Sequence, residues 1–312
     1  MTQQNAIVDK LLTNVSNKLM PVGFIADQVL PSIKVKQTSG LIGKYGNEAL
    51  RVTNTVHAGE GEYPRVDTVT RSSDTYNIVD HGLQGVITKR DFDNVEKPYD
   101  ARIDETDNLT TRLTLGAEVA LATALLDPLI ITQGTILLGN AQYNNRSHAD
   151  SNPVEDFQTA QNTIIDAIGM PANVAIMDRK VYNALRMHED LLDSLGFKFN
   201  RNGGLTGQEL AMALELDQIL IGDSFYDSSK LGQTSIITRV WGKDIVLAKV
   251  GAPALRQKVL GFTFSSTGSS RRQVNRWSMN TPIGSEGLAV SDNYDQLILN
   301  AECAYLIQDA IA

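Results

Sequence analysis

The stretch from Ile33 to Ile78 constrains the fold most, because it alternates like a β-strand but offers no apolar face. Segments such as SIKVKQT, ALRVTNTV and EYPRVDTVTRS repeat with a period of two and are rich in Val, Thr and charges of both signs. Glycines punctuate the stretch at Gly40, Gly43, Gly46, Gly59 and Gly61. Neither face can contribute to a core, so we expect long, largely solvated strands joined by flexible turns. Exposed strand edges pair with other chains, which indicates that this excursion makes intermolecular contacts.

The glycine-rich part of this stretch, SGLIGKYGNEALRV (Ser39–Val52), has the composition of a phosphate-binding loop but not its spacing. Such a loop needs two glycines about five positions apart followed by Lys and Ser or Thr, so that backbone N–H groups surround the phosphates. Here Lys44 is followed by Tyr45, and Thr38 stands where the first glycine would be needed. The spacing argues against a nucleotide site.

The length and charge of the chain limit the classes of protein to which it can belong. A chain of 312 residues with 42% apolar content suggests roughly two domains with substantial cores. The net charge of -8 argues against an electrostatically driven nucleic-acid binder. The single cysteine excludes an intrachain disulfide framework and fits a reducing cytoplasm. We see no signal pattern and no apolar run of about 18 residues, so we expect a soluble protein with no membrane partner.

Two helices are predicted before the middle of the chain. The first thirty residues read as an arm with a short amphipathic helix that ends at Pro21 and carries Ile7, Leu11, Leu12 and Val15. The longest helical signal runs from Tyr99 to Leu126, starts with acidic residues and stops at Asp127-Pro128. It predicts a spine of roughly 40 Å. Its two apolar rows are Leu109, Leu113, Ala117, Ala120 and Ala124, and Leu115, Val119, Ala122 and Leu125.

The middle third predicts a mixed α/β unit. Asn152-Pro153 opens a helix that Gly169 ends, and Thr206 with Glu209 forms a capping box. Short buried strands are expected at Val174–Met177 and Ile219–Gly222, and later strands at Ile245–Val250, Gly261–Phe264 and Val274–Met279. We expect a last strand, Leu297–Ile307, to return and pack on the spine helix.

The search for catalytic or metal chemistry returns no specific site. The four histidines are scattered without ligand spacing: His57, His81, His148 and His188. Cys303 lies in an apolar segment and is interpreted as core. Asp178 and Asp223 each follow a buried strand, where α/β enzymes place catalytic acids, but a helix cap or turn former is the favoured interpretation. We therefore predict no cofactor and no metal.

The densest basic cluster is Arg271, Arg272 and Arg276, with Trp277 beside it. Arg and Trp could stack on a nucleic-acid strand. Such clusters more often pair with carboxylates, on the same chain or on a neighbouring one, and the acidic balance of the protein favours this interpretation.

The order of these segments resembles that of the major capsid proteins of tailed bacteriophages, which have the HK97 fold. Three stretches carry the resemblance: ADQVLPSIKVKQTSGLIGKYGNEALRV (Ala26–Val52), YNIVDHGLQGVITKRDFDNVEKPYD (Tyr76–Asp100) and PANVAIMDRKVYNALRMHEDLLDSL (Pro171–Leu195). They are similar to the start of that family's extended loop, to the segment before its spine helix, and to a strand and helix of its A-domain. The resemblance covers most of the chain, in segment order rather than in any one motif.

The resemblance implies an α+β, HK97-like capsid fold in five parts. These are an N-terminal arm (1–32), an extended β-loop (33–78), a P-domain with the spine helix (79–150), an A-domain (151–265) and strands returning to the P-domain (266–312). The extended loop would reach over a neighbouring subunit. The residues expected to make subunit contacts are Lys44, Tyr45, Arg51, Glu60, Glu62, Arg271, Arg272 and Arg276.

By the same resemblance, the chain is expected to be a structural protein rather than an enzyme. It would assemble with itself into pentamers and hexamers of an icosahedral shell that encloses phage double-stranded DNA and contacts it non-specifically. Separate scaffolding, portal and decoration proteins are possible partners. We expect the protein in the virion, after assembly in the host bacterial cytoplasm.

Two alternatives remain open at this point. An encapsulin-type nanocompartment shares the fold but encloses cargo enzymes, and the sequence separates it poorly from a phage capsid. A small α/β enzyme that acts on a phosphorylated ligand through Asp178 or Asp223 belongs to a different class. Assembly into large particles without a ligand would argue against the enzyme.

Overall fold

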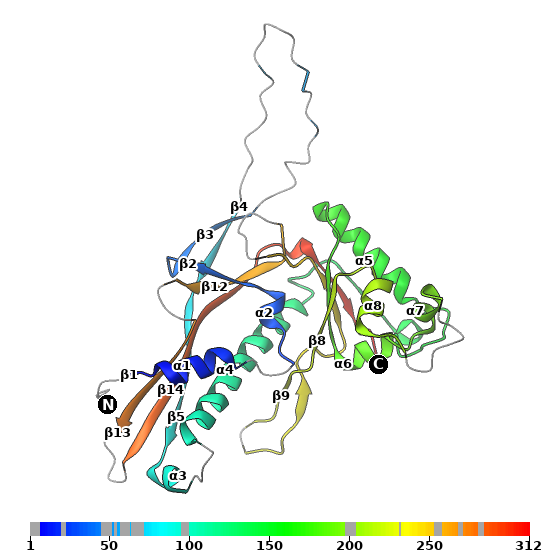
Figure 1. Cartoon of the computed structure of the whole chain (residues 1–312). Coiled ribbons are helices and arrows are strands. Elements are labelled where there is room, and N and C mark those ends of the chain that lie inside the picture. The colour runs from blue at the N-terminus through cyan, green and yellow to red at the C-terminus, as the bar shows by residue number, and fades with distance from the viewer. Residues whose placement is uncertain are drawn as a thin grey trace.

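Two β-sheets and one long helix organise the chain in the computed structural model (Figure 1). The structure describes residues 7–19, 23–44, 52, 55–56, 63, 72–94, 100–196, 204–230, 232–252, 258–267, 271–279 and 284–312. Within this part of the chain, none of the helices is both long and apolar enough to cross a membrane.

The first sheet, here called the long sheet, has the strand order β1-β13-β14-β12-β2, with β5 paired to β14. Only β2 and β12 run parallel; the other pairs are antiparallel. Its strands are β1 (Ile7–Val8), β2 (Ser32–Val35), β5 (Val79–Ile87), β12 (Gly261–Ser266), β13 (Arg272–Met279) and β14 (Ser285–Ile298).

The second sheet has the order β6-β15-β11-β7-β8. Its central strands β7 and β11 are buried at every position, because helices and loops cover both faces. Its strands are β6 (Gly134–Ile136), β7 (Val174–Asp178), β8 (Gln218–Gly222), β11 (Ile245–Ala248) and β15 (Ala304–Gln308). The helices around it are α5 (Pro153–Ile168), α6 (Arg179–Leu185), α7 (Glu189–Ser194) and α8 (Gly207–Ala213).

The long helix α4 (Ala101–Leu125) joins the two sheets, as predicted for a spine. Its first half runs along β5 and β14, where Leu109 packs with Val274, Leu288 and Val290 (Figure 1). Its last turns enter the core of the second sheet through three apolar residues: Leu121, Ala122 and Leu125. One helix therefore fixes both halves of the subunit to each other.

The remaining elements are short. They include the helices α1 (Lys10–Lys18), α2 (Ala26–Val29) and α3 (Lys89–Asn94) and the turns η2 (Gly139–Ala141) and η3 (Ala301–Cys303). Two separate two-stranded sheets pair β3 (Ser39–Lys44) with β4 (Ser72–Asn77), and β9 (Phe225–Asp227) with β10 (Ile237–Arg239).

Local cap signals predicted several boundaries correctly. The helix α5 starts at Pro153 and ends at Gly169, whose φ of 77° is a left-handed conformation that favours glycine. The capping box of Thr206 and Glu209 is present at the start of α8. The Asp178 side chain caps α6 by accepting a hydrogen bond from the Lys180 N–H.

The predicted last strand is wrong in its extent. The segment Leu297–Ile307 is not one strand, because β14 ends at Ile298 and the turn η3 reverses the chain before β15. The strand β15 pairs with β11 and β6 in the second sheet, whose core also contains the last turns of α4. Its residues Ala304 to Ile307 are all buried, which suits a central position in that sheet.

The predicted inner faces of two helices also need correction. In α1, Leu11 is 65% exposed, and the buried residues are Leu12, Thr13 and Ser16. The two hydroxyl groups are buried because they have partners: the Ser16 Oγ lies 2.8 Å from the Thr110 Oγ1, and the Thr13 Oγ1 accepts the Val274 N–H.

In α4, Ala120 of the first predicted apolar row is exposed. The buried positions of the helix instead include Glu118, which an apolar pattern does not select.

Candidate assembly surfaces

The strands β3 and β4, here called the loop base, flank the segment predicted to be the extended loop. Contrary to the expectation that this stretch contributes to no core, Ile42 and Tyr76 share a small core with Ile33 of β2 and Phe264 of β12. The Tyr76 ring stacks on Phe264 of β12 with 4.8 Å between ring centroids, and Ile42 is buried in the same cluster. Gly40 lies beneath this tyrosine, where a Cβ atom would come within 2.7 Å of the Tyr76 hydroxyl oxygen. The first glycine of the SGLIGKYG stretch therefore makes room for packing.

Lys44 lies at the end of β3 and pairs with Asp74 of β4, with 2.7 Å between Nζ and Oδ2. The Lys44 and Asp74 side chains are 32% and 37% exposed, so the pair lies at the surface. Four of the expected contact residues, Tyr45, Arg51, Glu60 and Glu62, lie outside the described residues. Their roles as subunit contacts stay predictions.

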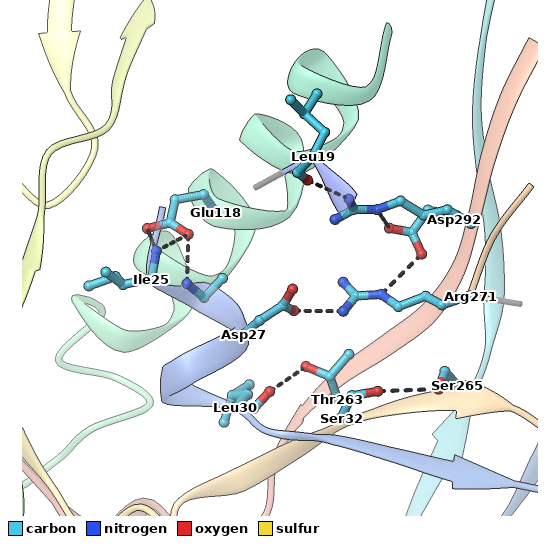
Figure 2. A network of polar contacts seen from close by, with 12 residues as sticks. Leu19, Ile25, Asp27, Leu30, Ser32, Glu118, Thr263, Ser265, Arg271 and Asp292 are labelled. Atoms are coloured by element: carbon cyan, nitrogen blue, oxygen red, sulfur yellow. Dashed lines mark hydrogen bonds and ion pairs between the residues drawn. The ribbon is translucent and has the colours of Figure 1, made fainter. Parts of the chain in front are cut away.

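The basic cluster pairs with carboxylates of its own chain (Figure 2). The Arg271 guanidinium donates to Asp27 of α2 at 2.7 Å and to Asp292 of β14 at 3.1 Å. The buried Arg272 donates to the other oxygen of Asp292 at 3.1 Å and to the carbonyl oxygen of Leu19 at 3.3 Å. Burial lowers the pKa of Arg271, but Asp292 and Asp27 together raise it above its ordinary value.

Arg276 is the most exposed member of the cluster, at 40% for its side chain. It lies 3.2 Å from Asp9 and 3.7 Å from Glu286, while Trp277 covers Gly287 on the neighbouring strand. These intrachain pairs agree with the carboxylate interpretation rather than with stacking on nucleic acid. Contact of the cluster with a neighbouring subunit stays a prediction, and Arg276 is the member best placed for it.

Glu118 on α4 is the residue that sequence reasoning missed. Its carboxylate is fully buried and accepts hydrogen bonds from the Ile25 N–H at 3.1 Å and from the Ala26 N–H at 2.8 Å (Figure 2). It also accepts the indole N–H of Trp241 at 2.7 Å. Trp241 is itself buried against Gly222 of β8. One carboxylate thus joins the arm, the spine helix and the second sheet.

No cation pairs with Glu118 among the residues that the structure describes. Burial raises the pKa of Glu118 above its ordinary value, against the lowering effect of the bonds from Ile25, Trp241 and Ala26. The nearby Asp27 raises it further. We call the set Asp27, Glu118, Arg271, Arg272 and Asp292 the arm junction, because its members hold Leu19 and residues 25–27 against α4, β13 and β14.

The candidates for chemistry have structural roles in this geometry. Asp178 caps α6 and pairs with Arg239 at 2.9 Å, and Asp223 pairs with Arg179. Cys303 is buried, and burial raises the pKa of its thiol to about 12. His188 is buried against Ser151, with 3.0 Å between Nε2 and Oγ. No group of three or more His, Cys, Asp or Glu side chains placed to hold a metal occurs in the described part of the chain.

The chain is similar in sequence to two phage proteins over nearly its whole length. It is 25% identical to the major capsid protein of Burkholderia phage BcepMu, over 96% of each chain. It is 22% identical to the major capsid protein of Pseudomonas phage JBD67, over 98% of this chain and 97% of that protein. No protein-family model matches the chain.

Solved structures have the same fold. A phage-related protein from Bordetella bronchiseptica is 26% identical, with a TM-score of 0.75 over 98% of this chain and 99% of that one. The capsid of the cyanophage P-SCSP1u superimposes with a TM-score of 0.59 at 11% identity, over 93% and 89%. An encapsulin of Synechococcus elongatus superimposes with a TM-score of 0.50 at 12% identity, over 98% and 96%. The predicted α+β, HK97-like capsid fold is confirmed.

Proposed function

We propose that this chain, whose fold and sequence relatives are those of phage major capsid proteins, is the structural protein of a phage shell. The observation that carries the proposal is the full-length similarity to two proteins named major capsid protein. The match extends over the arm, the loop base, the spine helix and the second sheet, so it does not rest on one shared domain.

The shell would be built from pentamers and hexamers of this chain and would enclose double-stranded DNA. Each subunit would make many modest contacts, which closure of the shell makes collectively strong. The net charge of -8 opposes assembly through repulsion, so apolar and ion-paired contacts have to outweigh it. Assembly would take place in the host cytoplasm, and scaffolding, portal and decoration proteins are further partners in this proposal.

The extended loop between β3 and β4 would contact a neighbouring copy. What supports this is its polar, glycine-punctuated sequence together with a base that is packed within the subunit through Tyr76 and Ile42. A packed base would fix the direction in which the loop leaves the subunit. Lys44 and Arg51 would then pair with acidic groups of the neighbour, and Tyr45 would pack beside them.

A role in structure rather than in catalysis fits the paired state of the acidic candidates. Asp178 and Asp223 each share their carboxylate with an arginine of the same subunit. Both carboxylates therefore already have a hydrogen-bonded partner within the subunit.

An encapsulin-type compartment is the second candidate function, because one of the matching folds is an encapsulin. The two functions share the shell and differ in its contents. The similarity of this chain to the encapsulin is confined to the fold, whereas its similarity to the phage proteins extends to the sequence.

Sedimentation and negative-stain imaging of the purified protein at neutral pH test the proposal. We expect closed hollow shells of megadalton mass, and nuclease-protected double-stranded DNA in particles recovered from infected cells. A monodisperse 34.1 kDa monomer under all assembly conditions would contradict it. Shells that enclose an enzyme and no DNA would support the compartment instead.

A further inference from the structure

The strand β5 (Val79–Ile87) forms an open edge of the long sheet. It pairs with β14 over nine consecutive residues, from Val79 opposite Tyr294 to Ile87 opposite Glu286, with no bulge. Among the described strands, β14 is its sole partner. The outer backbone N–H and C=O groups of β5 therefore remain available for another strand.

The exposure of β5 is unusual for a strand of this length. The side chains of Val79, Leu83 and Val86 are 49%, 38% and 49% exposed. The helix α4 covers only its last part, where Glu105 lies over Gly85 and Ile87 is buried.

Asp80 is the one charged residue of β5, and the other usual protections of an edge strand are missing from it. Lys, Pro and a bulge discourage pairing with other chains, and the sequence VDHGLQGVI contains no lysine or proline. A long, regular, partly apolar edge of this kind is a template for a further strand.

We propose that β5 pairs antiparallel with β5 of a second copy, around a two-fold axis that passes at Leu83. The inference rests on the proposed function, because a shell brings copies of the chain together. A two-fold contact uses the same patch on both copies, so β5 has to be complementary to itself.

The sequence of β5 meets this condition. With the axis at Leu83, all nine residues find a partner, and the opposite pairs are Val79 with Ile87, Asp80 with Val86, His81 with Gly85, Gly82 with Gln84, and Leu83 with itself. No two like charges stand opposite each other, and Leu83 adds an apolar pair at the centre. The longer side chains of His81 and Gln84 each face a glycine, which leaves them room.

The other terminal strands of the sheet fit less well. The strand β1 (Ile7–Val8) has only two residues and β2 (Ser32–Val35) only four, so either would leave most of β5 unpaired. Pairing centred on Asp80 would place the two Asp80 carboxylates opposite each other, at a cost in free energy. The self-pairing at Leu83 is therefore the arrangement that uses the whole edge.

Cysteine crosslinking in assembled particles tests this arrangement. The single native cysteine, Cys303, is buried, so wild-type particles serve as the background. Leu83→Cys places two thiols directly opposite each other, within the reach of a disulfide. We expect most Leu83→Cys subunits to run as covalent dimers on a non-reducing gel after mild oxidation.

Matched controls use the same strand. Val86→Cys and Asp80→Cys are expected to stay monomeric, because each residue faces the other and not itself. The double variant Asp80→Cys/Val86→Cys is expected to form dimers without higher multimers, because a two-fold contact closes on itself. A ladder of multimers would instead mean a head-to-tail contact and would overturn the proposal.

The experiment separates this inference from the proposed function. Particles that form normally while Leu83→Cys crosslinks no better than Val86→Cys would overturn the β5 pairing and leave the shell intact. If Leu83→Cys impairs assembly, the double variant decides, since it leaves Leu83 in place. If the wild type forms no particles, the proposed function fails and the β5 pairing fails with it.

Discussion

The arm junction and the β5 edge both lie along the long sheet, but they satisfy their polar groups in opposite ways. At the arm junction every charged group is shared with another segment of the same chain: Arg271 and Arg272 both contact Asp292, and Glu118 accepts three N–H groups. At the β5 edge a whole row of backbone groups faces outward. The subunit pairs the charges of the arm junction internally. The outer backbone groups of β5, in contrast, lie where we propose that a neighbouring subunit binds.

From this difference we expect the arm junction to determine folding and the exposed surfaces to determine assembly. Substitutions at the junction should change the stability of the free subunit. Substitutions at the loop base or at β5 should change the yield of particles with little effect on that stability.

The largest effect is expected from Arg272→Met. The substitution leaves the Asp292 carboxylate, which is 3% exposed, with only Arg271 as a partner, and it frees the carbonyl oxygens of Ser16 and Leu19. Breaking a buried pair on one side costs about 3 kcal/mol or more. Denaturant unfolding of the unassembled subunit measures this loss.

Arg276→Met is the matched control for the junction, because Arg276 is half-exposed on the same strand. Its pairs with Asp9 and Glu286 should contribute less than about 1 kcal/mol. Equal losses for the two variants would mean that burial does not distinguish the junction from the surface.

Glu118→Gln should cost less but should change the pH dependence. An amide NH₂ replaces one acceptor oxygen, so at least one of the three donors loses its partner, at about 2 kcal/mol near pH 7. The folded state raises the pKa of Glu118 above its ordinary value of 4.5. Its contribution to stability is therefore greatest below that value and is lost as the pH rises through the folded pKa.

The measurement compares unfolding of the wild type and of Glu118→Gln at a series of pH values above 4.5. We expect the free energy of unfolding to fall with rising pH more steeply in the wild type than in the variant. Thr123→Ala, at an exposed position of the same helix, removes no ionisable group and should leave the slope unchanged. If the free energy of unfolding changes with pH in parallel for the wild type and Glu118→Gln, the titration of Glu118 does not contribute to stability and the prediction is wrong.

The smallest effect on the free subunit is expected at the loop base. Lys44→Glu with Arg51→Glu should lower shell yield while the free energy of unfolding changes by less than about 1 kcal/mol, because the Lys44–Asp74 pair lies at the surface. Sedimentation of particles and unfolding of subunits measure the two quantities. Wild-type shell yield from the double variant would contradict the loop contact.

A charge swap sharpens this prediction. Lys44→Asp with Asp74→Lys restores the pair inside the subunit but reverses the charges that a neighbour would meet. Yield that stays low in the swap supports contact with a neighbour. Full recovery of shell yield would mean that Lys44 acts only through its pair with Asp74 within the subunit.

Local signals in the sequence predicted the elements whose partners lie nearby. Asn152-Pro153, Thr206 with Glu209, and Asp178 each act within a few residues of their own helix, so their patterns are readable without the fold. The spine helix and the central strands were predictable because their apolar periods are long or continuous.

Residues with distant partners could not be read in this way. Glu118 looks like a solvated charge until α2 and Trp241 are placed against it, and each of these partners is more than 90 residues away. The place of β15 depended on a turn at Ala301–Cys303 that carries no Gly or Pro signal. The available hint of a buried acceptor was the position of Glu118 between Ala117 and Val119, which belong to the two apolar rows.

Hydrogen exchange of the free subunit and of the assembled particle compares the arm junction with the proposed assembly surfaces in one experiment. We predict that assembly adds protection at the β5 amides of Val79–Ile87 and at the base strands β3 and β4. The amides of Ile25 and Ala26 should be equally protected in both states, because they already donate hydrogen bonds to Glu118 inside the subunit. Unchanged exchange at β5 and at the loop base, with new protection only at the arm junction, would contradict the assignment of β5 and the loop base to assembly and of the arm junction to folding.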